Sequence, residues 1–207
     1  MGPLCPTPPA GCSGPLARLG FVLSPRQTEL ADVALSILER EGLGAVSFRA
    51  VASASGWSLG AVQKAFGSKD ELVRAMYIRH RQGAPSLGVG SGPLAERLVA
   101  VFMSLMPGDA ASRATTLEAA AFTERAAHDA RIAGAVAASD AGLRATIAGW
   151  VREEQARGRV GEEVDADGVA WTFVALAHGA ATQLLYAPRP DAEVRALASA
   201  AVSRLLG

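Results

Sequence analysis

The sequence predicts an all-α protein in which an N-terminal three-helix unit precedes a larger helical bundle. Half of the 207 residues are apolar but only 5% are aromatic, and Ala and Gly dominate, which favours closely packed helices over a sheet rich in Val, Ile and Tyr. Helix-capping residues recur along the first third of the chain, and apolar residues follow them at helical spacing. A chain of this length can also bury a core of its own.

The first 23 residues are expected to form a disordered tail, because they contain five prolines and lack the basic start and continuous apolar stretch of a secretory signal. The two cysteines, Cys5 and Cys12, both lie in this tail. We therefore expect neither a disulfide framework nor a metal site, and a reducing cytoplasm fits this cysteine usage.

The first helix should begin at Ser24, with Pro25 at its first position and Gln27 completing a capping box. It should end near Gly42 or Gly44. One face then carries the apolar residues Leu30, Val33, Ala34, Ile37 and Leu38.

Two short helices and a fourth helix are expected next. Ser47 can cap a helix over residues 48–55, Gly56 can turn the chain, and Ser58 can cap a third helix over 59–66. Ser68 and Glu71 have the spacing of a capping box that opens a fourth helix, over 70–81.

The Gly- and Pro-rich run 83–93 is the clearest internal break, since it cannot sustain a helix. A domain boundary is therefore expected near this run. We assign residues 24–70 to a helix-turn-helix domain and residues 71–207, which include the fourth helix, to a second domain. In the second domain, apolar spacing predicts helices near 94–105, from 132 to about Gly158, and over 191–206.

The stretch 168–186 contains no Asp, Glu, Lys or Arg and is long enough to span a bilayer. His178, Gln183 and two threonines would then lie in hydrocarbon. We expect this helix to be buried in protein, with no membrane partner.

Ala52, Gly56 and Val62 have the spacing of a helix-turn-helix: a small residue where two helices cross, a glycine in the turn and an apolar anchor on the second helix. The surrounding sequence reads Gly56-Trp-Ser-Leu-Gly-Ala-Val-Gln-Lys-Ala-Phe-Gly-Ser-Lys-Asp-Glu-Leu72. Over residues 24–77 it resembles the DNA-binding domain of the tetracycline repressor family. Gln63 and Lys64 depart from the Tyr and His usual there.

The resemblance implies that residues 59–66 enter the major groove of a double-stranded DNA operator. The expected DNA contacts are Ser47, Arg49, Ser58, Leu59, Gly60, Ala61, Gln63, Lys64 and Lys69. Trp57 replaces a small apolar residue, and we interpret it as a core residue.

Charge distribution gives independent support for an N-terminal DNA site. The formal net charge of the chain is zero, but Lys64 and Lys69 are its only lysines. Segment 26–81 has eight basic and six acidic residues, net +2, whereas segment 82–207 has eleven and fourteen, net −3. Phosphate contacts should therefore come from the N-terminal unit.

By the same resemblance, the second domain binds a small molecule and its last two helices pair with those of a second copy. Small residues in the uncharged helix would let another helix approach closely, and symmetric half-sites need two reading helices. The expected dimer contacts are Ala177, His178, Ala180, Ala181 and Leu184. His178 is either a hydrogen-bonded core or interface residue or, less often for such a residue, a pH sensor or ligand contact.

A pocket for a small apolar or amphipathic effector should be mostly apolar with a few polar groups, although each such residue is more often core than ligand contact. The expected pocket residues are Phe102, Met103, Met106, Glu118, Phe122, Trp150 and Trp171.

Two other classes of protein fit the sequence less well. Glu124 and His128 have neither the spacing nor the copy number of a metal-bundle enzyme, and the sequence has no phosphate loop or nucleophile motif, so we expect no catalytic residue and no cofactor. A purely architectural DNA-binding protein would not need a large apolar bundle. The prediction is a homodimeric repressor released by its effector; an activator, or a DNA-binding protein without a ligand, is the alternative.

Overall fold

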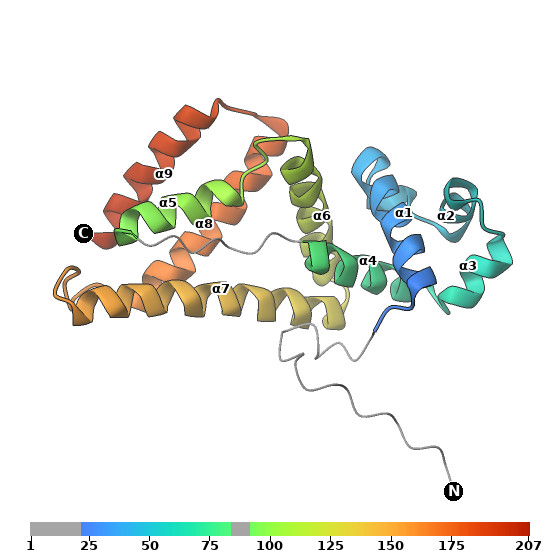
Figure 1. Ribbon diagram of the computed structural model, residues 1–207, viewed down its shortest axis with the longest axis horizontal. Coiled ribbons are helices and arrows are strands. Elements are labelled where there is room, and N and C mark those ends of the chain that lie inside the picture. Colours follow the sequence, from blue (N-terminus) through green and yellow to red (C-terminus); the bar gives the residue numbers. More distant parts are fainter. Residues whose placement is uncertain (1–21, 84–91) are drawn as a thin grey trace, which may run out of the picture.

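The structure, a computed structural model, describes residues 22–83 and 92–207, and these contain nine α-helices, one 3-10 turn and no strand. Helices α1–α4 gather at one end of the molecule and α5–α9 at the other (Figure 1). The all-α prediction is confirmed. Most of the expected tail and most of the run 83–93 lie outside the described residues. The helices are α1 Pro25–Glu41, α2 Phe48–Ser55, α3 Leu59–Ala65, α4 Lys69–Gly83, α5 Leu94–Ser104, α6 Ala110–Ala126, α7 Ala130–Ala156, α8 Ala166–Tyr186 and α9 Asp191–Leu206.

Helix α1 begins with the expected capping box. The Ser24 hydroxyl accepts the Gln27 N–H at 3.3 Å, and the Gln27 side-chain oxygen accepts the Ser24 N–H at 3.0 Å. The helix ends where Gly42 takes a φ of +82°, which favours glycine.

The turn between α2 and α3 also has the predicted local chemistry. Ser47 and Ser58 each accept a backbone N–H of the helix that follows, from Ala50 at 3.1 Å and from Ala61 at 3.2 Å. Between them, Gly56 takes a left-handed conformation with a φ of +75°. These residues set the crossing of the two helices.

The start of α4 differs in one detail from the predicted capping box. The Ser68 hydroxyl accepts the Glu71 N–H at 3.1 Å, as expected. The Glu71 carboxylate, however, accepts the N–H of Gly67 at 2.8 Å. The cap therefore reaches one residue further back along the chain than in a capping box, to Gly67 instead of Ser68.

The N-terminal core is not closed by α1–α4 alone. Leu30, Val51, Val62 and Met76 are fully buried in it, together with a further group from the second half of the chain. That group is Phe122 of α6 with Ile132 and Ala135 of α7. The two halves of the molecule therefore share one apolar surface at their junction.

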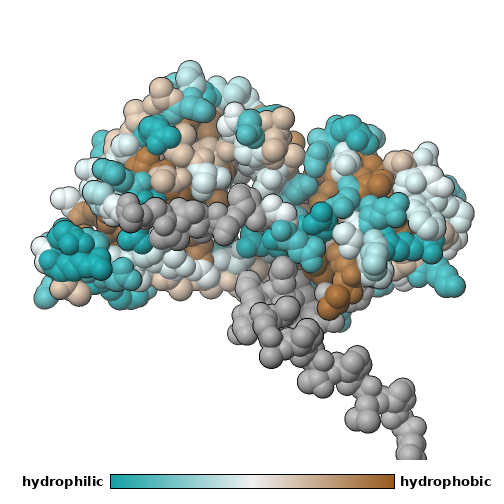
Figure 2. Space-filling model, viewed as in Figure 1, coloured by the Kyte–Doolittle hydropathy of each residue, from teal (hydrophilic) through white to brown (hydrophobic). Residues whose placement is uncertain are grey.

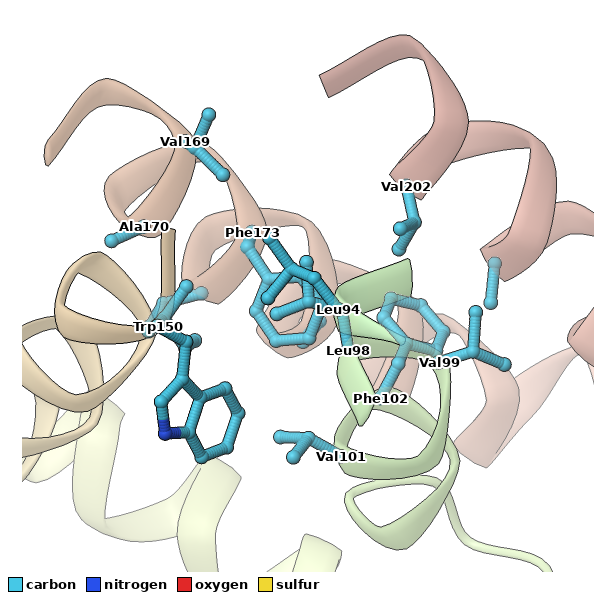
Figure 3. Packing of buried hydrophobic residues seen from close by; sticks show 14 of the residues in the cluster. Leu94, Leu98, Val99, Val101, Phe102, Trp150, Val169, Ala170, Phe173 and Val202 are labelled. Carbon is cyan, nitrogen blue, oxygen red and sulfur yellow. The ribbon is translucent and has the colours of Figure 1, made fainter. Parts of the chain in front are cut away.

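A second core lies among α5, α7, α8 and α9. Figure 3 shows Leu98 and Phe102 of α5 against Phe173 of α8 and Val202 of α9. The Phe102 and Phe173 rings meet edge to face with centroids 6.1 Å apart. This core fixes α5, α8 and α9 relative to one another.

Helix α6 was not predicted as a separate element. The Asp109 side chain accepts the Ser112 N–H at 2.7 Å, and the Ser112 hydroxyl accepts the Asp109 N–H at 2.9 Å. This capping box is a local start signal that we overlooked. Few large apolar residues follow it, so the helix has a weak periodic pattern.

Helix α8 is the one described helix that is long and apolar enough to cross a membrane by length and composition. Its Val169, Phe173 and Ala177 face the protomer core, but Trp171 and Leu176 are exposed. Within one protomer, α8 is therefore buried on one side only. An apolar face of α8 remains uncovered.

Candidate functional site

The residues expected to contact DNA lie together on α2, α3 and the start of α4. All nine are solvent-exposed except Ala61, which is half-buried. This end of the molecule shows mostly hydrophilic to neutral colours on the face drawn in Figure 2, at the right. The predicted surface is therefore accessible to a large polar partner.

Helix α3 is held from below and from one end. Val62 and Phe66 are fully buried beneath it. The Gln27 side-chain amide of α1 donates to the Ala65 carbonyl at 2.9 Å. The exposed side chains of α3 thus project from a fixed backbone.

This surface is basic without competing acid. Residues 42–69 contain Arg49, Lys64 and Lys69 and no Asp or Glu. Within the described ranges, none of the three basic side chains forms an ion pair. Each can therefore neutralise a phosphate without first breaking an internal contact.

The structure corrects the interpretation of Trp57 as a core residue. Its side chain is 38% exposed, its indole N–H donates to Glu29 at 3.1 Å, and the Arg26 guanidinium lies 4.0 Å from the ring centroid. The space beneath the turn is already filled by smaller apolar side chains and by Phe66. Trp57 instead ties the turn to α1 at the surface.

A cavity of about 880 Å³ lies among α4, α5, α6, α7 and α8. Its volume suits a small-molecule ligand. The wall combines hydroxyl side chains, small apolar residues and five ionisable groups. The hydroxyl residues are Ser104, Ser112, Thr115, Thr116, Thr123, Ser139, Thr146 and Thr182; the apolar ones are Leu105, Ala119, Ala120, Ala138, Gly142, Leu143 and Ala181; the ionisable ones are His80, Arg81, Glu124, Asp140 and His178.

None of the seven expected pocket residues is among these lining residues. Phe102, Met106 and Trp150 are buried in the C-terminal core, Met103 packs beside them, and Trp171 is 62% exposed. Phe122 and Glu118 are buried directly behind the wall, where both contact His80. Large aromatic side chains form the core of the bundle, and smaller polar ones line its cavity.

A chain of polar groups runs from the cavity toward α1. His80 Nδ1 donates to the Glu118 carboxylate at 2.5 Å, and both side chains are buried. The Glu118 carboxyl also lies near that of Glu39 on α1. Partial desolvation, followed by the nearby Glu118 carboxyl, raises the pKa of Glu39 above its usual value.

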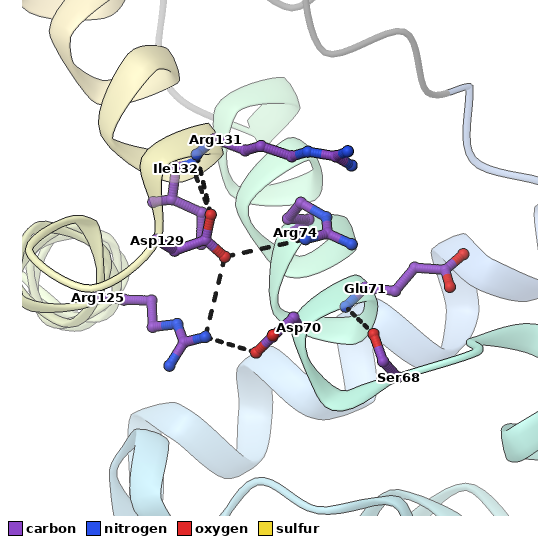
Figure 4. Close-up of polar contacts among 8 residues, drawn as sticks. All are labelled: Ser68, Asp70, Glu71, Arg74, Arg125, Asp129, Arg131 and Ile132. Atoms are coloured by element: carbon purple, nitrogen blue, oxygen red, sulfur yellow. Dashed lines mark hydrogen bonds and ion pairs between the residues drawn. The ribbon is translucent and has the colours of Figure 1, made fainter.

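A second polar contact joins the start of α4 to the bundle. Arg125 lies 2.5 Å from Asp70 and 3.9 Å from Asp129, and Arg74 also reaches Asp129 at 3.9 Å (Figure 4). The Asp129 side chain is only 10% exposed. Helix α4 is therefore joined to α6 and to the start of α7 near its own start, and to α6 again through His80 near its end.

The expected dimer residues divide into two groups. Ala177 and Ala181 are buried against the protomer's own core, so their side chains cannot reach a second copy. Ala180 and Leu184 are half-buried, and His178 lines the cavity with its Nε2 3.9 Å from Asp140. The exposed large apolar residues on α8 and α9 are instead Trp171, Leu176, Tyr186 and Leu197.

Sequence reasoning missed His80, Asp140 and the ring of serines and threonines. Glu118 was the one polar group expected near the pocket, and the structure brings it to His80 across 38 positions of sequence. No local pattern signals such a pairing. Only the apolar surroundings of Glu118 and its distance from any local cation hinted at it.

Comparisons with known proteins agree with this geometry. Residues 30–76 match the model for bacterial regulatory proteins of the tetR family, and residues 94–207 match that for the C-terminal part of BetI-type transcriptional repressors. A comparison with curated protein sequences found no match.

Solved structures are similar over most of the chain. A transcriptional regulator from Rhodococcus sp. Rha1 is 25% identical with a TM-score of 0.77, covering 87% of this chain and 95% of its own. A putative transcriptional regulator from Saccharomonospora viridis, in complex with choline, is 20% identical with a TM-score of 0.75, covering 86% and 95%. The multidrug binding protein EbrR, complexed with imidazole, is 21% identical with a TM-score of 0.63, covering 89% and 96%.

Proposed function

We propose a specific function for this chain from the family to which it belongs, the tetR family of bacterial regulatory proteins, with a C-terminal domain of the BetI-type repressors. The proposed function is that of a homodimeric repressor, which a small molecule releases from a pseudo-palindromic operator. Membership confirms that the protein is a DNA-binding transcription regulator and not an enzyme. The dimer, the operator symmetry and the release are our proposal.

The observation that carries the proposal is the basic surface formed by residues 42–69, which include α2 and α3 and contain no Asp or Glu. Arg49, Lys64 and Lys69 supply phosphate contacts, and Gln63 is exposed on α3 beside Lys64, where it can reach a base edge. Three cations per subunit are few, so affinity depends on two subunits binding together.

The uncovered apolar residues of α8 and α9 support a dimer. Trp171, Leu176 and Leu197 are 62%, 41% and 57% exposed. Large exposed apolar side chains mark interaction surfaces in soluble proteins. A second copy packed here would bury them and place two α3 helices on one side of the assembly.

The cavity supports an effector of small, amphipathic character. Relatives of the same fold were crystallised with choline or imidazole, which are small polar molecules. We propose no cofactor and a cytoplasmic location, where operator DNA is found.

Release requires that the effector bind the DNA-incompetent arrangement more tightly than the competent one. Helix α4 is suited to transmit this difference, because Asp70 lies near the DNA surface and His80 lines the cavity. The contact of Glu118 with Glu39 offers a second route, directly to α1. The two α3 helices of a dimer must stay about 34–36 Å apart to enter both half-sites of the operator. A small tilt of α4 or α1 that moves α3 would therefore weaken binding.

The test begins with selection of bound duplexes from a random pool. An enriched sequence should be a pseudo-palindrome with half-sites about one helical turn apart. Enrichment of a single half-site or of no sequence would reject the symmetric mode. A Lys64→Ala, Lys69→Ala double variant is the matched control, since it keeps the buried anchors of α3 and should enrich nothing.

Transcription in vitro from a promoter that contains the enriched site separates a repressor from an activator. A repressor lowers the transcript yield as protein is added, and an activator raises it. An effector titration then follows DNA anisotropy. If no compound that binds the cavity changes anisotropy, the regulator acts without a ligand.

A further inference from the structure

Most hydroxyl groups of the cavity wall are already committed as donors. Five of them give their hydrogen to a backbone carbonyl of their own helix: Ser104 to Val101 at 2.8 Å, Thr115 to Ala111 at 3.1 Å, Thr116 to Ser112 at 2.8 Å, Thr123 to Ala119 at 2.9 Å and Thr146 to Gly142 at 3.0 Å. A hydroxyl has one hydrogen, so each of these oxygens has only acceptor capacity left for a ligand.

Two carboxylates add to this excess of acceptors. The Asp140 side chain is 26% exposed, and His178 Nε2 lies 3.9 Å from it, which is too long for a hydrogen bond. Glu124 also lines the cavity and forms no ion pair in the part of the chain that the structure describes. Both acids can therefore accept hydrogen bonds from a ligand.

The donors left on the wall are Arg81, the ring nitrogens of His80 and His178, and the hydroxyls of Ser139 and Thr182. Arg81 is the one guanidinium on the wall, against the two carboxylates of Glu124 and Asp140. His80 commits Nδ1 to Glu118, which leaves Nε2 as its free ring nitrogen. Because two carboxylates face one guanidinium, the wall favours a ligand that brings a positive charge and N–H groups.

The described wall carries no Phe, Tyr or Trp. The rings of Tyr77 and Phe122 lie behind it, with centroids 6.3 and 5.4 Å from that of His80. A quaternary ammonium such as choline carries no N–H and is held in proteins mainly by aromatic faces. This wall therefore favours a different kind of cation.

We propose that the cavity binds an amphipathic primary or secondary ammonium, whose N–H groups donate to the Ser, Thr and carboxylate oxygens while its hydrocarbon body packs on the Ala and Leu residues of the wall. The assignment rests on the proposed function only in treating this cavity as the effector site. Ligand binding is measured without DNA, so the ligand class can be rejected while the proposed repressor function stands, and the reverse.

The experiment uses four probes that share one hydrocarbon tail: octylamine, octan-1-ol, octanoate and octyltrimethylammonium. Each is titrated into the full-length protein at pH 7 below its aggregation concentration, with calorimetry or ligand-observed NMR as the readout. Octylamine should bind at least about fivefold more tightly than octyltrimethylammonium and octanoate, with octan-1-ol between them, because one or two hydrogen bonds distinguish the head groups.

Three variants assign the preference to the wall. Thr146→Val should lower the octylamine affinity about threefold to tenfold and leave octyltrimethylammonium unchanged. Asp140→Asn should weaken both cationic probes, and octylamine more, because octylamine loses a hydrogen bond as well as the charge attraction. Thr28→Val is the matched control: the Thr28 hydroxyl makes the same bond to its own helix, to Ser24 at 3.1 Å, but lies on α1 and does not line the cavity. It should change neither affinity.

Equal binding of all four probes, tighter binding of the quaternary probe, or no saturable binding of octylamine at millimolar concentration would overturn the ligand class. So would a Thr28→Val effect as large as that of Thr146→Val. Operator binding measured on the same preparations tells whether the proposed regulator stands when the ligand class falls.

Discussion

Gln27 bridges the start of α1 and the end of α3: its side-chain amide donates to the Ala65 carbonyl at 2.9 Å while its side-chain oxygen accepts the Ser24 N–H at 3.0 Å. Ala65 is the last residue of α3, where carbonyls lack a partner in their own helix. One side chain thus fixes the direction of the helix expected to enter the major groove, although it points away from the exposed surface.

Gln27→Ala should lower operator affinity about threefold to tenfold without removing a DNA contact, because α3 loses its terminal bond and samples other directions. Ser24→Ala is the matched control. It removes the same α1 cap but leaves the amide bond to Ala65, so it should cost about 1 kcal/mol of unfolding free energy and little affinity. Anisotropy with the selected operator, at a temperature where both variants are folded, compares them. Equal affinity losses would show that the cap, and not the bond to Ala65, matters.

Lys64→Ala should weaken binding to operator and to random duplex alike, and should reduce the slope of log K against log salt by about one unit per subunit. Lys64 is exposed and free of internal ion pairs within the described residues, so no folding penalty is expected. Arg195→Ala, an exposed cation on α9, is the control and should leave the slope unchanged. A loss confined to one operator base pair would make Lys64 a base reader.

Leu197→Arg should convert a dimer to a folded monomer, because Leu197 is 57% exposed on the uncovered face of α9 and a charge there is desolvated only on association. Ala177→Arg should instead unfold the protomer, since Ala177 is fully buried within it. Sedimentation with circular dichroism separates these results. Val22→Arg, at a residue that is 96% exposed, is the control. A Leu197→Arg variant that stays dimeric places the interface elsewhere.

His80 and Glu39 should be energetically coupled through Glu118. His80→Gln and Glu39→Gln should show an interaction free energy of about 0.5 kcal/mol or more in a double-mutant cycle on urea unfolding. The same cycle with Glu124→Gln in place of His80→Gln should be additive, because Glu124 lines the cavity without bonding to His80 or Glu118 among the described contacts. Additivity in both cycles would show that His80, Glu118 and Glu39 do not couple the cavity to α1.

Acid should destabilise the protein partly through Glu154. Hydrogen bonds from Arg159 and Arg157 hold the pKa of Glu154 at about 2, below the usual value of 4.5 for a glutamate. A depressed pKa means that the unfolded chain binds the proton first, so this stabilisation is present above pH 4.5 and is lost as the pH falls toward 2. Urea midpoints of the wild type and Glu154→Gln should differ at pH 7 and converge near pH 2. Glu153→Gln, at an exposed position, should follow the wild type throughout.

The sequence was most informative where structure is set by neighbouring residues. The caps at Ser24, Ser47 and Ser58 and the turn at Gly56 depend on side chains within three or four positions, so their helix starts were predicted correctly. The cavity is different, because its wall is assembled from five helices.

The large side chains predicted to line the pocket do not line the cavity. Phe102 and Trp150 are the kind of side chain that lines apolar ligand sites. Their large apolar area, however, also gives the most free energy when it is buried in the core, where both residues lie. Serines and threonines such as Thr116 and Thr146 carry no such signal, because their role depends on which helix face meets the cavity. Trp57 shows the opposite error, since an aromatic residue expected inside is held at the surface by Arg26 and Glu29.

The burial of Phe122, Ile132 and Ala135 in the N-terminal core has a thermodynamic consequence. An excised fragment ending after α4 would leave this patch of its core open to water and should be much less stable than the same helices in the full chain. The whole chain should instead melt as one cooperative unit. A compound bound among α4–α8 would then raise the melting temperature reported by Trp57, at the far end of the molecule, and a thermal-shift screen could find cavity ligands before any operator is known.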